Sequence, residues 1–303
     1  MTAIPSWQSR FLSRAVAKLI RREDWGGEWR LKILARAVFG APAPYRWLTA
    51  YGVKVEKSTG AAGEWINPKE PKRGVVLYIH GGGYVSCSAK THRPLTAALA
   101  RRTRRKVFSV EYRRAPEARF PAALDDVIAA YQFVLANIPV DEPVAIAGDS
   151  AGGGLALALA MHARDAGLTQ PACVVLFSPW TDLEGTGASL TANDGKCAMF
   201  RPRNIEQFAK IYLGDVSPRN PKASPLFGAA SNLPPVQFHV GITELLLDDS
   251  VRVHERILQT AGSSELLYND SFHGMQVVTP ILPEARESLQ AAAEFMVRHF
   301  ERV

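Results

Sequence analysis

Five consecutive residues, Gly148-Asp149-Ser150-Ala151-Gly152, could make a serine side chain chemically reactive. They match the G-x-S-x-G pattern, a sharp turn from a strand into a helix that holds a serine hydroxyl clear of the backbone. The flanking sequence suits that turn, because an apolar run of strand type (143–147) precedes it and a run of helix formers (155–161) follows it. The glycines keep side chains away from the tight backbone. The pattern therefore predicts that Ser150 is a nucleophile.

A second motif, His80-Gly81-Gly82-Gly83, could stabilise the anion that such a nucleophile generates. Attack on a carbonyl carbon forms a tetrahedral oxyanion, and fixed backbone N–H groups stabilise it without reorganising. We expect Gly82, Gly83 and Ala151 to supply these groups, with Gly81 as a further candidate. The alternatives are a flexible turn or a phosphate cradle. No G-x-x-x-x-G-K-[ST] string follows, and the glycines do not extend to G-x-G-x-x-G, so we favour the oxyanion site.

Taken in order, these motifs resemble the hormone-sensitive-lipase-like branch of the α/β-hydrolases. The resemblance is carried by the segments His80–Tyr84, Glu111–Glu117, Phe120–Val127, Gly148–Gly153 and Ser178–Trp180, and it extends from about Tyr45 to the C-terminus. One departure is Arg114, which stands where the family usually has leucine. The resemblance implies an α/β-hydrolase fold and an esterase that needs neither metal nor cofactor.

A serine hydroxyl needs a base to take its proton, and a histidine is the usual one. His273 follows a strand-like run and a polar turn and precedes Gly274-Met275, which resembles the histidine–glycine loop of the family. We therefore predict that His273 is the base. The other histidines beyond Ser150 are not expected to act as the base. His299 is expected at the surface, and structural or solvated roles are expected for His162, His239 and His254.

The histidine in turn needs an acid to orient it, and in this fold the acid lies between serine and histidine in the chain. Related sequences place it about three residues beyond the strand that ends at Gly241, which indicates Glu244. Many relatives have aspartate there, so a glutamate is a departure. Asp248 is the second candidate. Asp248 and Asp249 fall in the first turns of the next helix, where acidic residues favour the helix dipole.

The elements around these motifs alternate between strand and helix. Helical stretches include 121–137, 151–166, 244–261 and 283–301. Strand-like runs cover 51–57, 62–67, 74–79, 106–112, 143–148, 172–178, 235–241 and 264–269. Such alternation predicts an eight-stranded, mostly parallel sheet flanked by helices, and the two short runs at the start predict an antiparallel edge.

Two segments do not belong to the sheet. Residues 1–48 are expected to form one or two amphipathic helices, and residues 182–213 interrupt the alternation between the sixth and seventh strands. The family resemblance implies that both segments pack together as a helical cap over the site. The predicted organisation is therefore a catalytic domain of residues 49–181 and 214–303, with 1–48 and 182–213 as the two cap segments.

The chain is basic, with 36 Lys and Arg against 29 Asp and Glu. Residues 1–47 hold nine basic and three acidic residues. A basic amphipathic helix can lie on an anionic membrane surface. We favour instead a cap helix whose basic residues face water. The run Arg101–Lys106 fits the C-terminal turn of a helix, where cations are favoured, so nucleic-acid binding is not expected.

Three dispersed cysteines, Cys87, Cys173 and Cys197, indicate neither a disulfide framework nor a zinc site. Cys173 is expected to be buried and Cys87 to lie near the pocket. The N-terminus has no signal-peptide pattern, and no apolar run is long enough to span a membrane. We therefore expect a cytoplasmic location.

These observations predict a serine carboxylesterase acting on short- to medium-chain acyl esters, the chain length being an implication of the family alone. A lactone, carbamate or amide hydrolase with the same three residues is the alternative within hydrolases. A non-catalytic small-molecule receptor is disfavoured, because both Ser150 and His273 are present. The expected binding partner is a small ester substrate. The sequence does not decide whether the protein forms a homodimer.

Overall fold

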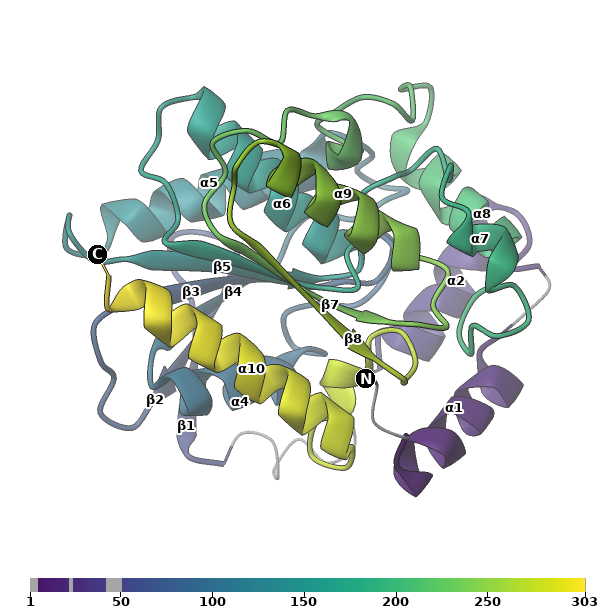
Figure 1. Cartoon of the computed structure of the whole chain (residues 1–303), viewed down its shortest axis with the longest axis horizontal. Helices are drawn as coiled ribbons and strands as arrows, with labels where there is room; N and C mark the ends of the chain where they lie inside the picture. Colours follow the sequence, from purple (N-terminus) through teal and green to yellow (C-terminus); the bar gives the residue numbers. More distant parts are fainter. Residues whose placement is uncertain (1–4, 22–23, 42–50, 303) are drawn as a thin grey trace.

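Eight strands form one twisted sheet at the centre of the molecule (Figure 1). The computed structural model describes residues 5–21, 24–41 and 51–302. The strands are β1 (Val53–Lys57), β2 (Gly63–Pro68), β3 (Val75–Ile79), β4 (Lys106–Val110), β5 (Val144–Asp149), β6 (Cys173–Phe177), β7 (Val236–Gly241) and β8 (Ser264–Asn269). Each begins and ends within two residues of its predicted run, so the strand prediction is confirmed.

The strand order is β1-β2-β4-β3-β5-β6-β7-β8. β2 pairs antiparallel with both β1 and β4, and every other neighbouring pair is parallel. The predicted antiparallel edge and the mostly parallel sheet are therefore confirmed. Parallel strands end at one common edge, so the loops after β3, β5, β7 and β8 meet there.

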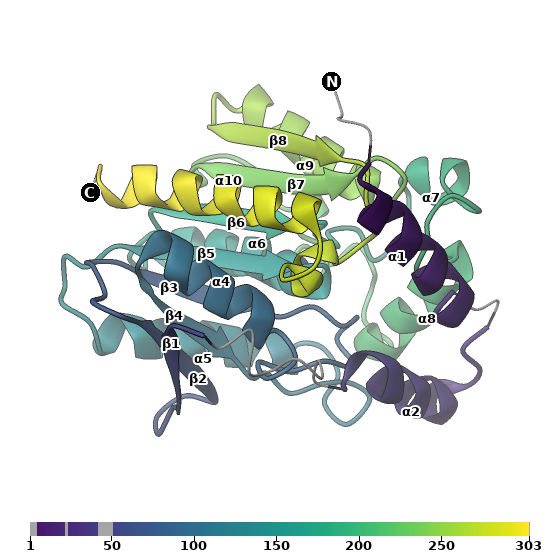
Figure 2. The same cartoon turned by 90° about the horizontal axis from the view of Figure 1, so that it is seen from below.

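Helices cover both faces of the sheet, as the near-continuous apolar runs of its central strands require. They are α4 (Arg93–Thr103), α5 (Ala122–Ala136), α6 (Ala151–Asp165), α9 (Leu247–Gln259) and α10 (Pro283–Phe300). Figure 2 shows α4 and α10 side by side on one face, with α5, α6 and α9 behind the sheet. A hydrophobic core lies on each side of the sheet, and successive residues of β3 point alternately into one core and the other. Val75, Leu77 and Ile79 pack on one side, and Val76 and Tyr78 on the other.

The other α-helices of the described residues lie beyond the carboxyl ends of the strands (Figure 2). They are α1 (Trp7–Leu19), α2 (Glu28–Phe39), α7 (Ser189–Ala192) and α8 (Pro202–Leu213). The buried Trp25 of the first predicted cap segment packs against the second, because its ring lies 5.9 Å from that of Phe208. Positions 1–4, 22–23 and 42–48 of the first predicted cap segment lie outside the described residues.

Two expectations are wrong in detail. The helix expected from residue 244 begins at Leu247, because residues 242–246 turn and the Glu244 carboxylate accepts the N–H of Gly241. His299 is buried rather than at the surface. Its Nδ1 lies 2.8 Å from the Phe295 carbonyl, and α10 turns this residue toward the sheet. Within the described part of the chain, no helix is long and apolar enough to cross a bilayer.

Candidate active site

Ser150 stands at the turn between β5 and α6 with a strained backbone, φ 52° and ψ −124°. A non-glycine residue rarely adopts this conformation. Its neighbours make the turn possible, since a Cβ on Gly152 would lie 2.2 Å from the carbonyl oxygen of Ile79. The N–H of Ser150 donates to Phe177 O at 2.9 Å, which ties the turn to β6. The serine side chain is thereby raised at the carboxyl edge of the sheet.

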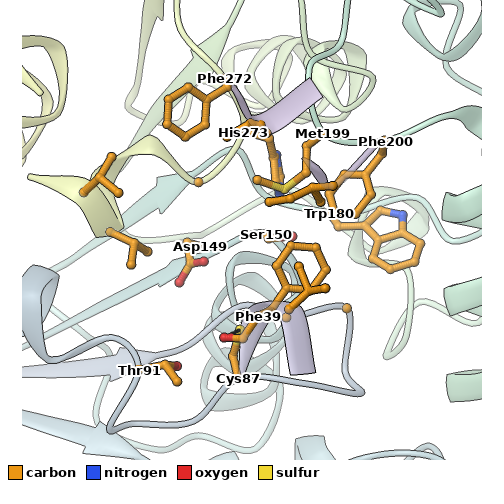
Figure 3. A pocket seen from close by; sticks show the side chains of 18 of the residues that line it. Phe39, Cys87, Thr91, Asp149, Ser150, Trp180, Met199, Phe200, Phe272 and His273 are labelled. Carbon is orange, nitrogen blue, oxygen red and sulfur yellow. Dashed lines mark hydrogen bonds between the residues drawn. The ribbon is translucent and has the colours of Figure 1, made fainter. Parts of the chain in front are cut away.

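His273 lies in the loop after β8, and its ring is directed toward Ser150 across the pocket floor (Figure 3). No hydrogen bond joins these two described side chains. Such bonds commonly tighten only when substrate binds. The Nδ1 atom of His273 lies 2.6 Å from Glu244 Oε2. Burial alone would lower the pKa of His273, but the charge and hydrogen bond of Glu244 outweigh it and raise that pKa.

Glu244 is held from both sides in the loop after β7. Its Oε1 atom accepts the N–H of Gly241 and the hydroxyl of Ser178, each at 2.7 Å. The side chain is 3 % exposed, so these bonds satisfy a carboxylate that water hardly reaches. The second candidate acid, Asp248, has a different partner, because its Oδ2 accepts the N–H of Ser189 at 2.9 Å. The structure thus brings Glu244, and not Asp248, to His273.

The glycine loop after β3 faces Ser150 across the same pocket. The N–H groups of Gly82, Gly83 and Ala151 donate to no acceptor within the described residues, which leaves them available. The N–H of Gly81 is engaged, because it donates to Asp149 Oδ1 at 2.9 Å. Gly81 is therefore not a free donor.

His80 braces this loop, because its Nδ1 lies 2.7 Å from the Gly81 carbonyl and its ring stacks on Tyr112 with centroids 4.2 Å apart. Tyr112 in turn donates its hydroxyl to the His80 carbonyl at 2.9 Å. Burial lowers the pKa of His80 to about 3, so this histidine stays neutral. The tyrosine of the Glu111–Glu117 segment thus supports the glycine loop.

Asp149 is buried beside Ser150, and sequence reasoning missed its partner His92. Asp149 Oδ1 accepts the hydroxyl of Tyr78 at 2.7 Å, and its Oδ2 lies 3.3 Å from His92 Nε2. Burial would raise the pKa of Asp149, but His92 and Tyr78 hold it below its ordinary value. The other nitrogen of His92 lies 3.0 Å from Thr91 Oγ1. No local signal marks His92, which lies 57 positions from its partner.

The histidines differ in what their nitrogens contact. Both nitrogens of His92 have partners, and so do those of His239, at Gln237 Oε1 and Ser288 Oγ. His273 has one nitrogen on Glu244, and the pocket lies before the other. Of the two histidines that line the pocket with Ser150, His92 and His273, only His273 therefore has a nitrogen without a partner among the described residues, and that nitrogen is placed to exchange a proton with Ser150.

The pocket has a volume of about 290 Å³ and is mainly apolar. Helices of both predicted cap segments line it, through Leu12 and Val16 of α1 and Ile205 and Phe208 of α8. The only cysteine among its lining residues, Cys87, has a pKa that burial raises to about 12, so its thiol stays protonated. Cys173 is also buried, as expected. No group of three His, Cys, Asp or Glu side chains among the described residues is arranged to hold a metal.

The fold, the elbow and the pocket together define an α/β-hydrolase. The family described as alpha/beta hydrolase fold matches residues 76–277. The acetyl-hydrolase of Streptomyces hygroscopicus is 38 % identical over 235 residues, which cover 77 % of this chain and 78 % of that protein. An esterase of Acinetobacter venetianus is 35 % identical and covers 78 % of each chain.

Solved structures agree over nearly the whole chain. A crystal structure of EstE5 soaked with p-nitrophenyl butyrate superposes with a TM-score of 0.89 at 32 % identity, covering 98 % of this chain and 99 % of that one. An esterase from the bacterial hormone-sensitive lipase family gives a TM-score of 0.87 at 31 % identity, with 98 % and 100 % covered. The chain belongs to the hormone-sensitive-lipase-like branch of the α/β-hydrolase family, and it is a carboxylic ester hydrolase.

Proposed function

We propose that this protein is a serine carboxylesterase that works through an acyl-enzyme, with Ser150 as nucleophile, His273 as base and Glu244 as orienting acid. One observation carries the proposal. His273 has its Nδ1 2.6 Å from the Glu244 carboxylate, while its other nitrogen faces the pocket that Ser150 lines. A base held in this way keeps the tautomer whose Nε2 can accept a proton.

In the proposed reaction, Ser150 Oγ attacks the ester carbonyl carbon while His273 Nε2 takes the hydroxyl proton. The carbonyl oxygen becomes an anion that the N–H groups of Gly82, Gly83 and Ala151 stabilise. Collapse breaks the bond to the alcohol, which leaves with the proton from His273. A water molecule then attacks the acyl group by the same route and releases the acid.

We propose short- to medium-chain acyl esters as substrates. The mainly apolar lining suits an acyl chain, and the volume of about 290 Å³ lies near the lower end for small-molecule sites. We further propose that residues 1–48 and 182–213 act as a cap on the catalytic domain. Three free cysteines fit a reducing compartment, so we propose a cytoplasmic location.

A fluorophosphonate reagent tests the nucleophile directly. The wild-type protein should be labelled on Ser150. Ser150→Ala should not be labelled, and its kcat for ester hydrolysis should be about 10⁶-fold lower. Unchanged labelling or activity of Ser150→Ala would refute the assignment. A circular dichroism spectrum equal to that of the wild type would show that the variant is folded.

A panel of esters with graded acyl length tests the substrate class, with lactones and amides of similar size included. Val16 lines the pocket from α1, so Val16→Phe should lower kcat/KM for longer acyl chains more than for acetate. Lys18→Phe adds the same ring to the exposed side of that helix and should leave the profile unchanged. A preference for lactones or amides over all esters would overturn the proposed substrate class.

A further inference from the structure

Helix α1 presents two different surfaces. Its inner side carries Leu12, Val16 and Ile20 into the pocket. Trp7 and Phe11 are also apolar residues of this helix, yet the structure leaves them 68 % and 65 % exposed. The apolar residues of this helix therefore serve two faces, and only one of them is covered by the protein.

Exposed apolar side chains concentrate in this part of the molecule. Of the eleven large hydrophobic residues that are exposed among the described positions, five lie on α1 and α2. Both helices lie at the same end of the molecule, beyond the carboxyl ends of the strands (Figure 2). Trp7 and Phe11 are four residues apart on α1 and so lie next to each other, and contiguous exposed apolar surface commonly marks a binding surface.

The outer side of α1 is also basic. Arg10, Arg14 and Lys18 are exposed and follow Trp7 at the spacing that places residues on one helical face. None of the three forms an ion pair within the described residues. No acidic residue occurs in this helix. The face thus combines two unburied aromatic rings with three unneutralised cations.

A cleft of about 250 Å³ runs beside this face, between α1 and the loops after β7, β8 and α7. Arg10, Arg14 and Lys196 line it together with serine and threonine hydroxyls, and Asp270 is its one acidic residue. Lys196, like the two arginines, makes no ion pair within residues 5–21, 24–41 and 51–302. Cations and hydroxyls that converge in a small cleft suit a phosphate group.

We propose that the outer face of α1, defined by Trp7, Arg10, Phe11, Arg14 and Lys18, docks on an anionic lipid surface. The two aromatic rings lie at the level of the headgroups, where Trp and Phe of interfacial helices insert. The cations bind the lipid phosphates, one of which occupies the cleft at Lys196. An anionic bilayer supplies both the negative charge and the apolar layer that this face requires. A second copy of this chain is a poorer partner, because its basic face would bring positive charge against positive charge.

Vesicle sedimentation tests this surface, and the wild-type protein should bind vesicles of equal parts phosphatidylglycerol and phosphatidylcholine. Binding to phosphatidylcholine alone should be much weaker. Binding should also be lost near 1 M salt, where the screening length is about 3 Å. Equal binding to both vesicles, or none to either at low salt, would overturn the proposal.

Paired variants locate the surface. Arg10→Gln with Arg14→Gln should weaken binding about 25-fold, because each charge contributes roughly a factor of five. Lys69→Gln with Lys72→Gln removes the same charge from the exposed loop between β2 and β3 and should have little effect. Trp7→Ser with Phe11→Ser should weaken binding about tenfold or more, while Tyr51→Ser with Val140→Ser, two other exposed sites, should not. Equal losses from test and control pairs would refute the assignment.

Two further measurements separate this surface from the catalytic site and from self-association. Ser150→Ala should bind vesicles as the wild type does, and Trp7→Ser with Phe11→Ser should keep its activity on a soluble ester. Phosphatidylglycerol brominated on its acyl chains should quench the wild-type fluorescence more than that of Trp7→Phe, which keeps an aromatic ring. A dimer that Trp7→Ser with Phe11→Ser dissociates, without vesicle binding, would overturn the lipid proposal.

Discussion

Glu244 Oε2 lies 2.6 Å from His273 Nδ1, and both side chains are almost completely buried. Glu244 comes from the loop after β7 and His273 from the loop after β8, two neighbouring strands of the sheet. The parallel register pairs Gly241 with Asn269, so both loops leave the sheet at the same level. The sheet therefore places the proposed acid and the proposed base side by side.

This pair predicts a large effect of Glu244→Gln. An amide that donates to His273 Nδ1 would favour the wrong tautomer, so kcat should fall by about 10⁴-fold while the fold is kept. Asp248→Asn is the matched control, because Asp248 accepts from Ser189 and does not contact His273. A steady-state assay of both variants decides between the two carboxylates. A larger loss in Asp248→Asn would show that the acid is assigned to the wrong residue.

The pH dependence of the reaction should report the same pair. The base acts as a neutral imidazole, so kcat/KM rises with pH as His273 loses its proton. Because Glu244 raises the pKa of His273, the midpoint of this rise should lie above 6.5. In Glu244→Gln burial dominates, and the midpoint should move to lower pH. An unchanged midpoint would mean that another group controls the acidic limb.

Much of the fold follows from local patterns in the chain. The central strands are short apolar runs bounded by turns, because parallel strands are covered on both faces, and this pattern locates each strand within two residues. Ser150 and the glycine loop also carry local motifs. No local motif decides between Glu244 and Asp248, because that choice depends on where the loop after β7 ends and α9 begins.

Two other features depend on contacts that no short window of sequence contains. Asp149 and His92 meet only after β5 and α4 pack, across 57 positions of the chain. The exposure of Trp7 and Phe11 depends on which side of α1 the catalytic domain covers. Helical spacing shows that Trp7 and Phe11 share one side of α1, but not that this side lies outward.

Gly82 tests the proposed oxyanion site. Its φ is 113°, and a Cβ at this position would lie 2.3 Å from Ser86 O, so Gly82→Ala must shift the loop and its N–H. We expect kcat to fall about 10²- to 10³-fold, with a smaller change in KM. Gly167→Ala is the control, because Gly167 has a φ of 65° but open space around it and lies outside the pocket. Equal losses in both variants would indicate general strain rather than a lost donor.

Asp249 gives a prediction about stability rather than catalysis. Its Oδ2 atom accepts the N–H groups of Thr181 and Asp182 at 2.6 and 2.8 Å in a buried site. Burial is the main cause that raises the pKa of Asp249 to about 7, and the charge of Asp182 adds to it. The folded protein therefore binds this proton more tightly than the unfolded chain does.

The sign of the effect follows from linkage. Between the unfolded pKa of about 4 and the folded pKa of about 7, the unfolded state has lost the proton and the folded state keeps it. Asp249 therefore makes the free energy of unfolding fall as pH rises through this window, by at most about 4 kcal/mol. Above the folded pKa of about 7, the contribution of Asp249 to the free energy of unfolding no longer changes with pH.

Asp249→Asn should remove this decline, because an amide oxygen can still accept both N–H groups but carries no titrating proton. Urea unfolding of wild type and variant over the same pH range gives the difference in free energy of unfolding, which should shift in favour of the variant as pH rises. Asp165→Asn, on an exposed aspartate at the end of α6, should not reproduce this trend. A difference between wild type and Asp249→Asn that stays constant from pH 4 to 7 would mean that Asp249 is already ionised at the lower end of the window.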